Sequence, residues 1–89
     1  MRTIWKKQLS WSDEQEISLP KAADLLEVQL QNDIPHLWAI VETDNPLELR
    51  KVYCRGTGHP MPEACGRQDF LGTVQAFGGL VFHFFKYPY

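Results

Sequence analysis

The fold class is decided by one stretch, which runs from EVQLQ at residues 27–31 through NDIP at 32–35 to HLWAIVET at 36–43. Apolar Val28 and Leu30 alternate with polar residues, which is the pattern of a strand with one buried face. The cluster of Asn, Asp and Pro indicates a turn. The run after it carries apolar residues on both faces, so it predicts a strand in the centre of a sheet.

Short strands are predicted on both sides of this stretch. They cover residues 2–11, 16–19, 49–55, 70–77 and 80–85. Gly78-Gly79 predicts a tight hairpin turn, and Pro20 could begin a single helical turn over residues 20–26. About seven short strands with little or no helix predict a mostly β fold. We expect a small antiparallel β-sandwich or barrel in a single domain over residues 1–89.

The net charge of −2 argues against binding to long nucleic acids, which requires a basic surface. The charge is unevenly distributed along the chain. Residues 1–48 hold four Lys or Arg against nine Asp or Glu, whereas residues 49–89 hold five against two. The C-terminal half is therefore basic, and it would tolerate a small anion.

The N-terminal residues Met1 to Lys7 contain no apolar segment of the kind found in secretory signals. No run approaches the roughly twenty apolar residues that cross a membrane. We therefore expect a cytoplasmic protein without a membrane partner, with Cys54 and Cys65 as reduced thiols. A disulfide between these two cysteines stays possible on sequence alone.

The segment from Arg55 to Pro62, RGTGHPMP, contains two glycines and two prolines and cannot be regular helix or strand. Two interpretations are about equally good. In the first, the glycines let backbone N–H groups approach a phosphate, with Thr57 as a hydroxyl donor. In the second, the prolines simply stiffen a structural turn.

Catalytic and metal-binding interpretations have less support. His36, His59, His83, Cys54 and Cys65 do not follow a recognised zinc spacing. Nothing in the sequence orients His59 toward Cys65 as a nucleophile–base pair, or toward Glu63 as an acid–base pair. We expect no catalytic residue, no metal and no cofactor.

The ligand-binding residues that the sequence predicts are eight. Arg55, Gly56, Thr57, Gly58, His59 and Arg67 would hold a phosphate, and Trp38 or Tyr53 would stack a base. Tryptophans in small β domains are also common core residues, so a core position for Trp38 is the alternative.

Aromatic residues are crowded at the end of the chain. Six fall in its last thirteen residues: Phe77, Phe82, Phe84, Phe85, Tyr87 and Tyr89. His83 lies among them, either as a hydrogen-bonded core residue or on a face that awaits a partner. We expect a homo-oligomer, with a dimer favoured, formed through this aromatic strand.

Four motifs resemble those of a family of small phage and prophage proteins: LWAIV at 37–41, GTGHP at 56–60, LGTVQ at 71–75 and LVFHF at 80–84. The resemblance covers nearly the whole chain, and GTGHP is its most specific part. The chain departs from the family at residues 63–69, where EACGR stands in place of a shorter acidic stretch. The resemblance implies a phage accessory protein that acts in the infected bacterium.

By analogy with other small phage proteins, the expected function is counter-defence. The protein would bind and sequester a small phosphorylated ligand, such as a cyclic or short nucleotide that signals immunity. One alternative is an inhibitor or structural accessory protein that binds another protein. A second is a metal-independent phosphodiesterase that uses His59. Sequestration rather than hydrolysis is the expected activity.

Overall fold

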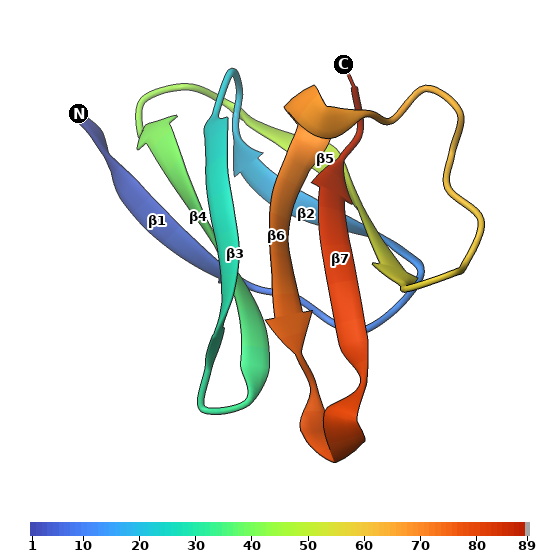
Figure 1. Cartoon of the computed structure of the whole chain (residues 1–89). Helices are drawn as coiled ribbons and strands as arrows, with labels where there is room; N and C mark the ends of the chain where they lie inside the picture. The colour runs from blue at the N-terminus through green and yellow to red at the C-terminus, as the bar shows by residue number, and fades with distance from the viewer. Residues whose placement is uncertain (89) are drawn as a thin grey trace.

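Seven strands form two antiparallel sheets in the computed structural model, which describes residues 1–88 (Figure 1). Tyr89, counted above among the C-terminal aromatic residues, lies outside the described residues. The strands are β1 (Arg2–Gln8), β2 (Glu14–Pro20), β3 (Asp24–Gln31), β4 (Ile34–Glu42), β5 (Leu47–Gly56), β6 (Phe70–Gln75) and β7 (Val81–Lys86). The only helical segments in residues 1–88 are the short 3₁₀ turns η1 (Arg67–Asp69) and η2 (Phe77–Gly79). None of the described helical segments is long and apolar enough to cross a membrane.

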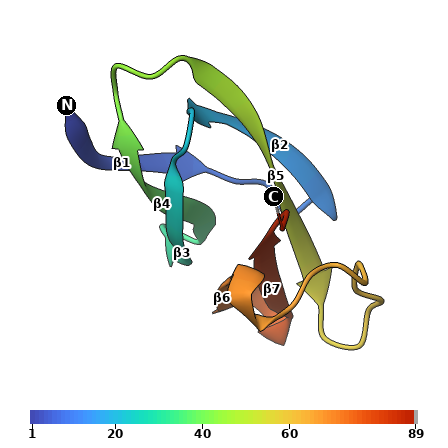
Figure 2. The same cartoon turned by 90° about the horizontal axis from the view of Figure 1, so that it is seen from above.

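The sheets have the strand orders β1-β4-β3 and β2-β5-β7-β6 and pack face to face as a small β-sandwich (Figure 2). The predicted fold class is thus confirmed. β4 lies between β1 and β3, as its apolar faces predicted. In the second sheet β5 and β7 are the inner strands, and both edges of β7 are hydrogen-bonded.

One core joins the two sheets. Val28 on β3 is buried and Leu30 packs against the core, so both predicted inward positions are confirmed. The fully buried members come from both sheets, which is what makes the sandwich a single cooperative unit. The core residues are Leu9, Ile17, Leu19, Ala23, Leu25, Val28, Leu37, Ala39, Val41, Val52, Cys54, Leu71, Val74 and Phe84.

A β-bulge changes the side-chain directions in each of the two neighbouring edge strands, β3 and β6. The pairing register shifts between Leu25 and Glu27 on β3 and between Phe70 and Gly72 on β6. Residues three apart in a regular strand point to opposite faces. The extra residue of each bulge brings Leu25 and Val28, and likewise Leu71 and Val74, onto the same buried side.

β3 and β6 run side by side where the two sheets meet (Figure 1). Gly72 on β6 lies so close to β3 that a Cβ atom there would stand 2.5 Å from the Val28 carbonyl oxygen. Its φ of 155° is also one that residues with a side chain rarely adopt. Only glycine therefore allows this contact between the sheets.

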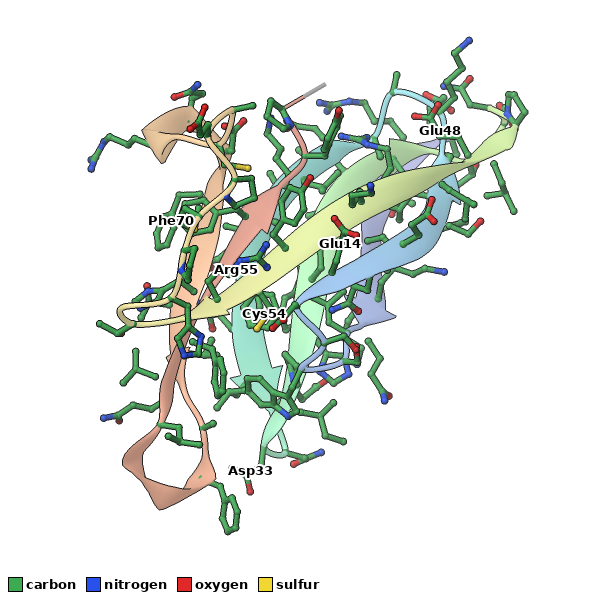
Figure 3. The ribbon with its side chains drawn as sticks, turned by 90° about the vertical axis from the view of Figure 1, so that its right-hand side faces the viewer. Glu14, Asp33, Glu48, Cys54, Arg55 and Phe70 are labelled. Carbon is green, nitrogen blue, oxygen red and sulfur yellow. The ribbon has the colours of Figure 1, made fainter. Side chains whose placement is uncertain are left out.

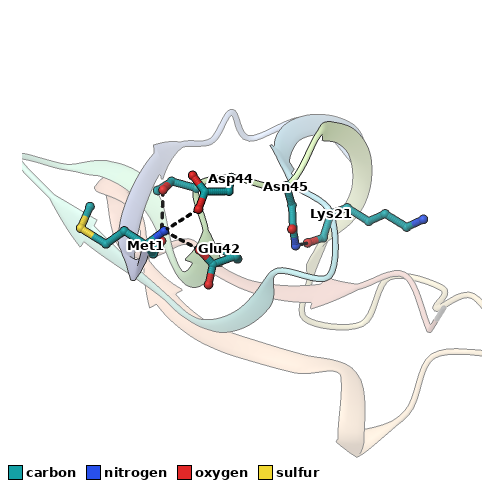
Figure 4. A network of polar contacts seen from close by, with 6 residues as sticks. Met1, Lys21, Glu42, Asp44 and Asn45 are labelled. Carbon is teal, nitrogen blue, oxygen red and sulfur yellow. Dashed lines mark hydrogen bonds and ion pairs between the residues drawn. The ribbon is translucent and has the colours of Figure 1, made fainter.

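The predicted helical turn over residues 20–26 is wrong. The chain makes a tight turn at Lys21 and Ala22, and β3 begins at Asp24. Backbone bonds from Lys21 N to Pro46 O (2.8 Å) and from Ala23 N to Pro20 O (3.2 Å) hold this turn. Asn45 adds a side-chain bond to the Lys21 carbonyl at 2.9 Å (Figure 4). Contact with the neighbouring loop thus prevails over the local preference for helix.

Several strand ends also differ from the sequence prediction. β1 ends at Gln8, so Trp11 lies in the link to β2, with its ring 5.1 Å from that of Phe82. β6 ends at Gln75, and Phe77 belongs to η2 rather than to a strand. The predicted two-residue hairpin is a longer turn, closed by a 2.7 Å bond from Ala76 N to Leu80 O.

The Gly72 contact gives a test of the fold. We expect Gly72→Ala to lower the free energy of unfolding by about 2–4 kcal/mol, because the new Cβ collides with the β3 backbone. In a domain of this size that corresponds to a fall in Tm of roughly 10 °C or more. Gly78→Ala is the matched control, since Gly78 has a positive φ but open space around it, and should cost about 1 kcal/mol. Equal losses in thermal melts of the two variants would contradict the close approach.

Candidate functional site

The segment Gly56–His59 forms a turn directly after β5. The His59 N–H donates to the Gly56 carbonyl at 3.1 Å, and Gly58 stands at the third position with φ 90°. A type II turn requires a positive φ at that position, which glycine supplies. The His59 ring lies over Gly56, where an added Cβ would meet the ring at 2.9 Å. The turn therefore has a defined shape with an exposed histidine.

Arg55 ties this loop to the sheet. Its Nε donates to the Pro60 carbonyl at 2.9 Å, and its Nη1 donates to the carbonyls of Asp13 and Cys54. Figure 3 shows Arg55 beside its chain neighbour Cys54. The Arg55 guanidinium also lies 5.4 Å from the Tyr53 ring centroid. Much of its hydrogen-bonding capacity is used within the protein. Arg55 thus serves mainly to hold the loop, while its positive charge stays beside it.

His83 on β7 is a second tie, and one that the predicted ligand-binding residues did not include. Its Nε2 lies 2.8 Å from the Thr57 hydroxyl and its Nδ1 lies 2.9 Å from the Thr73 hydroxyl. A neutral imidazole has one donor and one acceptor nitrogen, and hydroxyl groups can match either. His83 therefore bridges the loop to β6 on the outer face of the second sheet. The apolar residues around His83 in the sequence provide no indication that it would contact the loop.

A hollow of about 190 Å³ opens between the loop and β7. It brings together five of the predicted residues with His83 and two apolar side chains. The lining residues are Arg55, Gly56, Thr57, Gly58, His59, Met61, His83 and Phe85. A glycine-containing turn, a hydroxyl and two imidazoles thus stand around one space, which we call the loop hollow.

The sixth predicted phosphate ligand, Arg67, lies next to this space. It lines an adjoining hollow of about 420 Å³ with Met61, Cys65, Gly66, Phe70 and Phe85. Arg67 is exposed, and its side chain makes no hydrogen bond or ion pair with the other described residues. Its guanidinium is therefore available to an anion, in contrast to that of Arg55.

The two residues predicted to stack a base are not brought to the loop hollow. Trp38 lies on β4 in the other sheet, with its ring 6.1 Å from that of His36. Tyr53 is on β5 but is buried between Arg55 and Tyr87, and burial raises the pKa of its phenol. Neither side chain lines the two hollows described above.

The segment after the loop is held by a buried carboxylate. Asp69 is 1% exposed, accepts a 2.9 Å bond from the Gly66 N–H, and lies 3.4 Å from the Lys86 ammonium. This is only the carboxylate half of a capping box, because glycine has no side chain that could return the bond. The sequence therefore carries no capping-box signature that could have indicated this role. Asp69 thus fixes where Arg67 enters the site.

Neither cysteine is poised as a nucleophile. Cys54 is a core residue, and burial raises the pKa of its thiol to about 11, with a further contribution from Asp13. Cys65 is half-buried and donates to the Lys86 carbonyl at 3.5 Å. Burial, and then the charge of Asp69, raises its pKa too. Both thiols are free, and both are held in the protonated, less reactive form.

Histidine, cysteine and carboxylate side chains form no metal-binding cluster in the described part of the chain. Within residues 1–88, no three of them come close enough together to hold a metal ion. No hydrogen bond joins His59 to Glu63 in the described part of the chain, so the acid–base pair that the sequence offered little reason to expect is not assembled in this structure.

Comparison with known proteins places the chain in a family. The model of a domain family of unknown function, DUF7352, matches residues 1–89. No curated protein and no solved structure matches the chain.

The state of the thiols can be tested by alkylation. At pH 8 we expect iodoacetamide to modify native Cys54 more than about 100-fold more slowly than the same cysteine in the unfolded chain, because its pKa is raised. Cys65 should react before Cys54, since it is less buried. Mass spectrometry of peptides over a time course measures both rates. Rapid native labelling of Cys54 would contradict its core position.

Proposed function

The chain belongs to the DUF7352 family, and we propose that it is a non-enzymatic binder of a small phosphorylated ligand of the nucleotide class. The single observation that carries this proposal is the convergence of Arg55, Gly56, Thr57, Gly58 and His59 around the loop hollow, together with His83. Backbone N–H groups in glycine-containing turns and hydroxyl groups are the usual partners of phosphate oxygens.

Charge supports a phosphate at this place. Arg55 contributes a positive charge even though its Nε and Nη1 donate to backbone carbonyls. Arg67 offers a guanidinium that no other described side chain occupies, and arginine suits the bidentate recognition of phosphate. Both belong to the basic half of an otherwise acidic chain. A compact anion fits this local balance better than a long polyanion does.

Binding without cleavage fits the groups around the hollow. The thiols of Cys54 and Cys65 are held protonated, and both nitrogens of His83 already have hydroxyl partners. His59 is exposed, with no residue that orients it as a base. Together with the resemblance to small phage proteins, this supports sequestration of a nucleotide signal of host immunity in the bacterial cytoplasm.

Ligand binding should be visible as thermal stabilisation. In a panel of cyclic and linear nucleotides, we expect at least one to raise the Tm, by about 10 °C at a concentration 100 times its Kd. Thr57→Val should weaken that binding about tenfold, because it removes a hydroxyl from the hollow. Thr73→Val is the matched control: it also loses a bond to His83 but does not line the loop hollow.

Native mass spectrometry and chromatography complete this experiment. The bound nucleotide should be recovered intact after incubation, as sequestration requires. If no nucleotide raises the Tm, the proposal is wrong. Turnover that stops in His59→Ala would instead favour a phosphodiesterase.

A second candidate function, binding to a protein partner, is favoured by the tip of the β6–β7 hairpin. Phe77 is 92% exposed and Leu80 58%, beside a hollow of about 440 Å³ lined by Trp11, Asp33, Ala76, Phe77, Leu80 and Phe82. Both edges of β7 are already paired, so a dimer cannot form by adding a strand to it. A second copy could place its own Phe77 in this hollow, which is the self-complementary contact of a two-fold dimer.

The mass of the protein in solution tests this dimer. If the tip forms the interface, Phe77→Ser with Leu80→Ser should convert a dimer to a monomer in size-exclusion chromatography with light scattering. The expected cause is the loss of two exposed apolar anchors. Leu49→Ser, which alters an exposed leucine on β5 away from the tip, should leave the mass unchanged. A wild-type monomer at high concentration would contradict self-association.

A further inference from the structure

A second hollow adjoins the loop hollow, and the two share the side chains of Met61 and Phe85 as their common wall. The second one, which we call the aromatic hollow, is lined by Met61, Cys65, Gly66, Arg67, Phe70 and Phe85. At about 420 Å³ it is larger than the loop hollow, and its lining is mostly apolar. The pair therefore forms a continuous surface with a polar part and an aromatic part.

Two phenylalanine rings give the aromatic hollow its character. The rings of Phe70 and Phe85 meet edge to face, with centroids 5.5 Å apart. Phe70 is 47% exposed, and Figure 3 shows it beside the segment that leads from the loop to β6. A ring exposed to this extent offers a surface on which a flat aromatic group can stack. Arg67 stands at the same hollow with a free guanidinium.

The walls of the aromatic hollow are held in place before any ligand binds. The Cys65 N–H donates to the Pro62 carbonyl at 3.1 Å, and the Cys65 thiol donates to the Lys86 carbonyl. Gly66 is fixed by the buried carboxylate of Asp69. A pre-formed wall reduces the loss of conformational entropy on binding.

We infer that the ligand carries an aromatic base as well as a phosphate, and that the base lies in the aromatic hollow on Phe70 while the phosphate lies in the loop hollow. This inference rests on the proposed function. It moves the base away from Trp38 and Tyr53, which the fold places elsewhere. It also places Arg67 at the base end of the site, in the hollow that shares Met61 and Phe85 with the loop hollow.

Two probes separate the parts of the ligand. Adenosine 5′-monophosphate and ribose 5-phosphate share the sugar and phosphate and differ only in the base. Calorimetry should show that the adenine improves affinity by about five- to 150-fold, the range expected for stacking one base on an aromatic side chain. Equal affinities would overturn the inference while leaving the phosphate site in place. Failure of both probes to bind would overturn the inference, and it would overturn the proposed function as well only if no nucleotide of the panel raises the Tm.

Variants locate the base. Phe70→Ala should reduce the affinity for adenosine 5′-monophosphate to that for ribose 5-phosphate, with the latter unchanged. Phe77→Ala, which truncates a more exposed phenylalanine at the hairpin tip, is the matched control and should change neither. In the unaltered protein, nuclear Overhauser contacts between adenine protons and the Phe70 ring give a readout that needs no variant. Contacts only to Trp38 or Tyr53 would overturn the inference.

Discussion

The close approach of Gly72 to the Val28 carbonyl is the constraint on which the sandwich depends. It brings β6 and β3, the edge strands of different sheets, within backbone contact. The bulges in both strands lie next to this point, and they turn Leu25, Val28, Leu71 and Val74 toward a shared core. Without a residue lacking Cβ here, the sheets would separate at this edge and the core behind it would loosen.

The candidate site depends on the strand pairing of the four-stranded sheet, to which β6 belongs. β5 and β7 are paired so that Arg55 faces His83 across the ladder, and β6 places Thr73 opposite His83 on the other side. The loop is therefore tied at three points: by Arg55 to backbone carbonyls, by Thr57 to His83, and beyond it by Asp69 to Gly66. These ties give the hollows a defined shape before a ligand binds. Pre-organisation of this kind improves affinity, because less conformational entropy is lost on binding.

Several glycines and aromatic residues that look alike in the sequence have different roles in the structure. Gly72 allows a contact between sheets, whereas Gly58 allows a turn. Phe84 is fully buried, whereas Phe77 is almost fully exposed. Residue type alone does not separate these cases, because each depends on which strand lies opposite. The same holds for the two arginines, of which Arg55 is bonded within the protein and Arg67 is not.

The sequence by itself determined the fold class, the central position of β4 and the location of the irregular loop, because alternation of apolar residues and clusters of Gly and Pro act locally. The tertiary structure alone decided that residues 20–26 form a turn and a strand, since the contact that holds them comes from Pro46 and Asn45. It also decided that Trp38 and Tyr53 stand apart from the loop hollow, and that His83, Phe70 and Asp69 belong to its surroundings. These positions depend on pairing between strands distant in the chain, and no local pattern encodes which strands will meet.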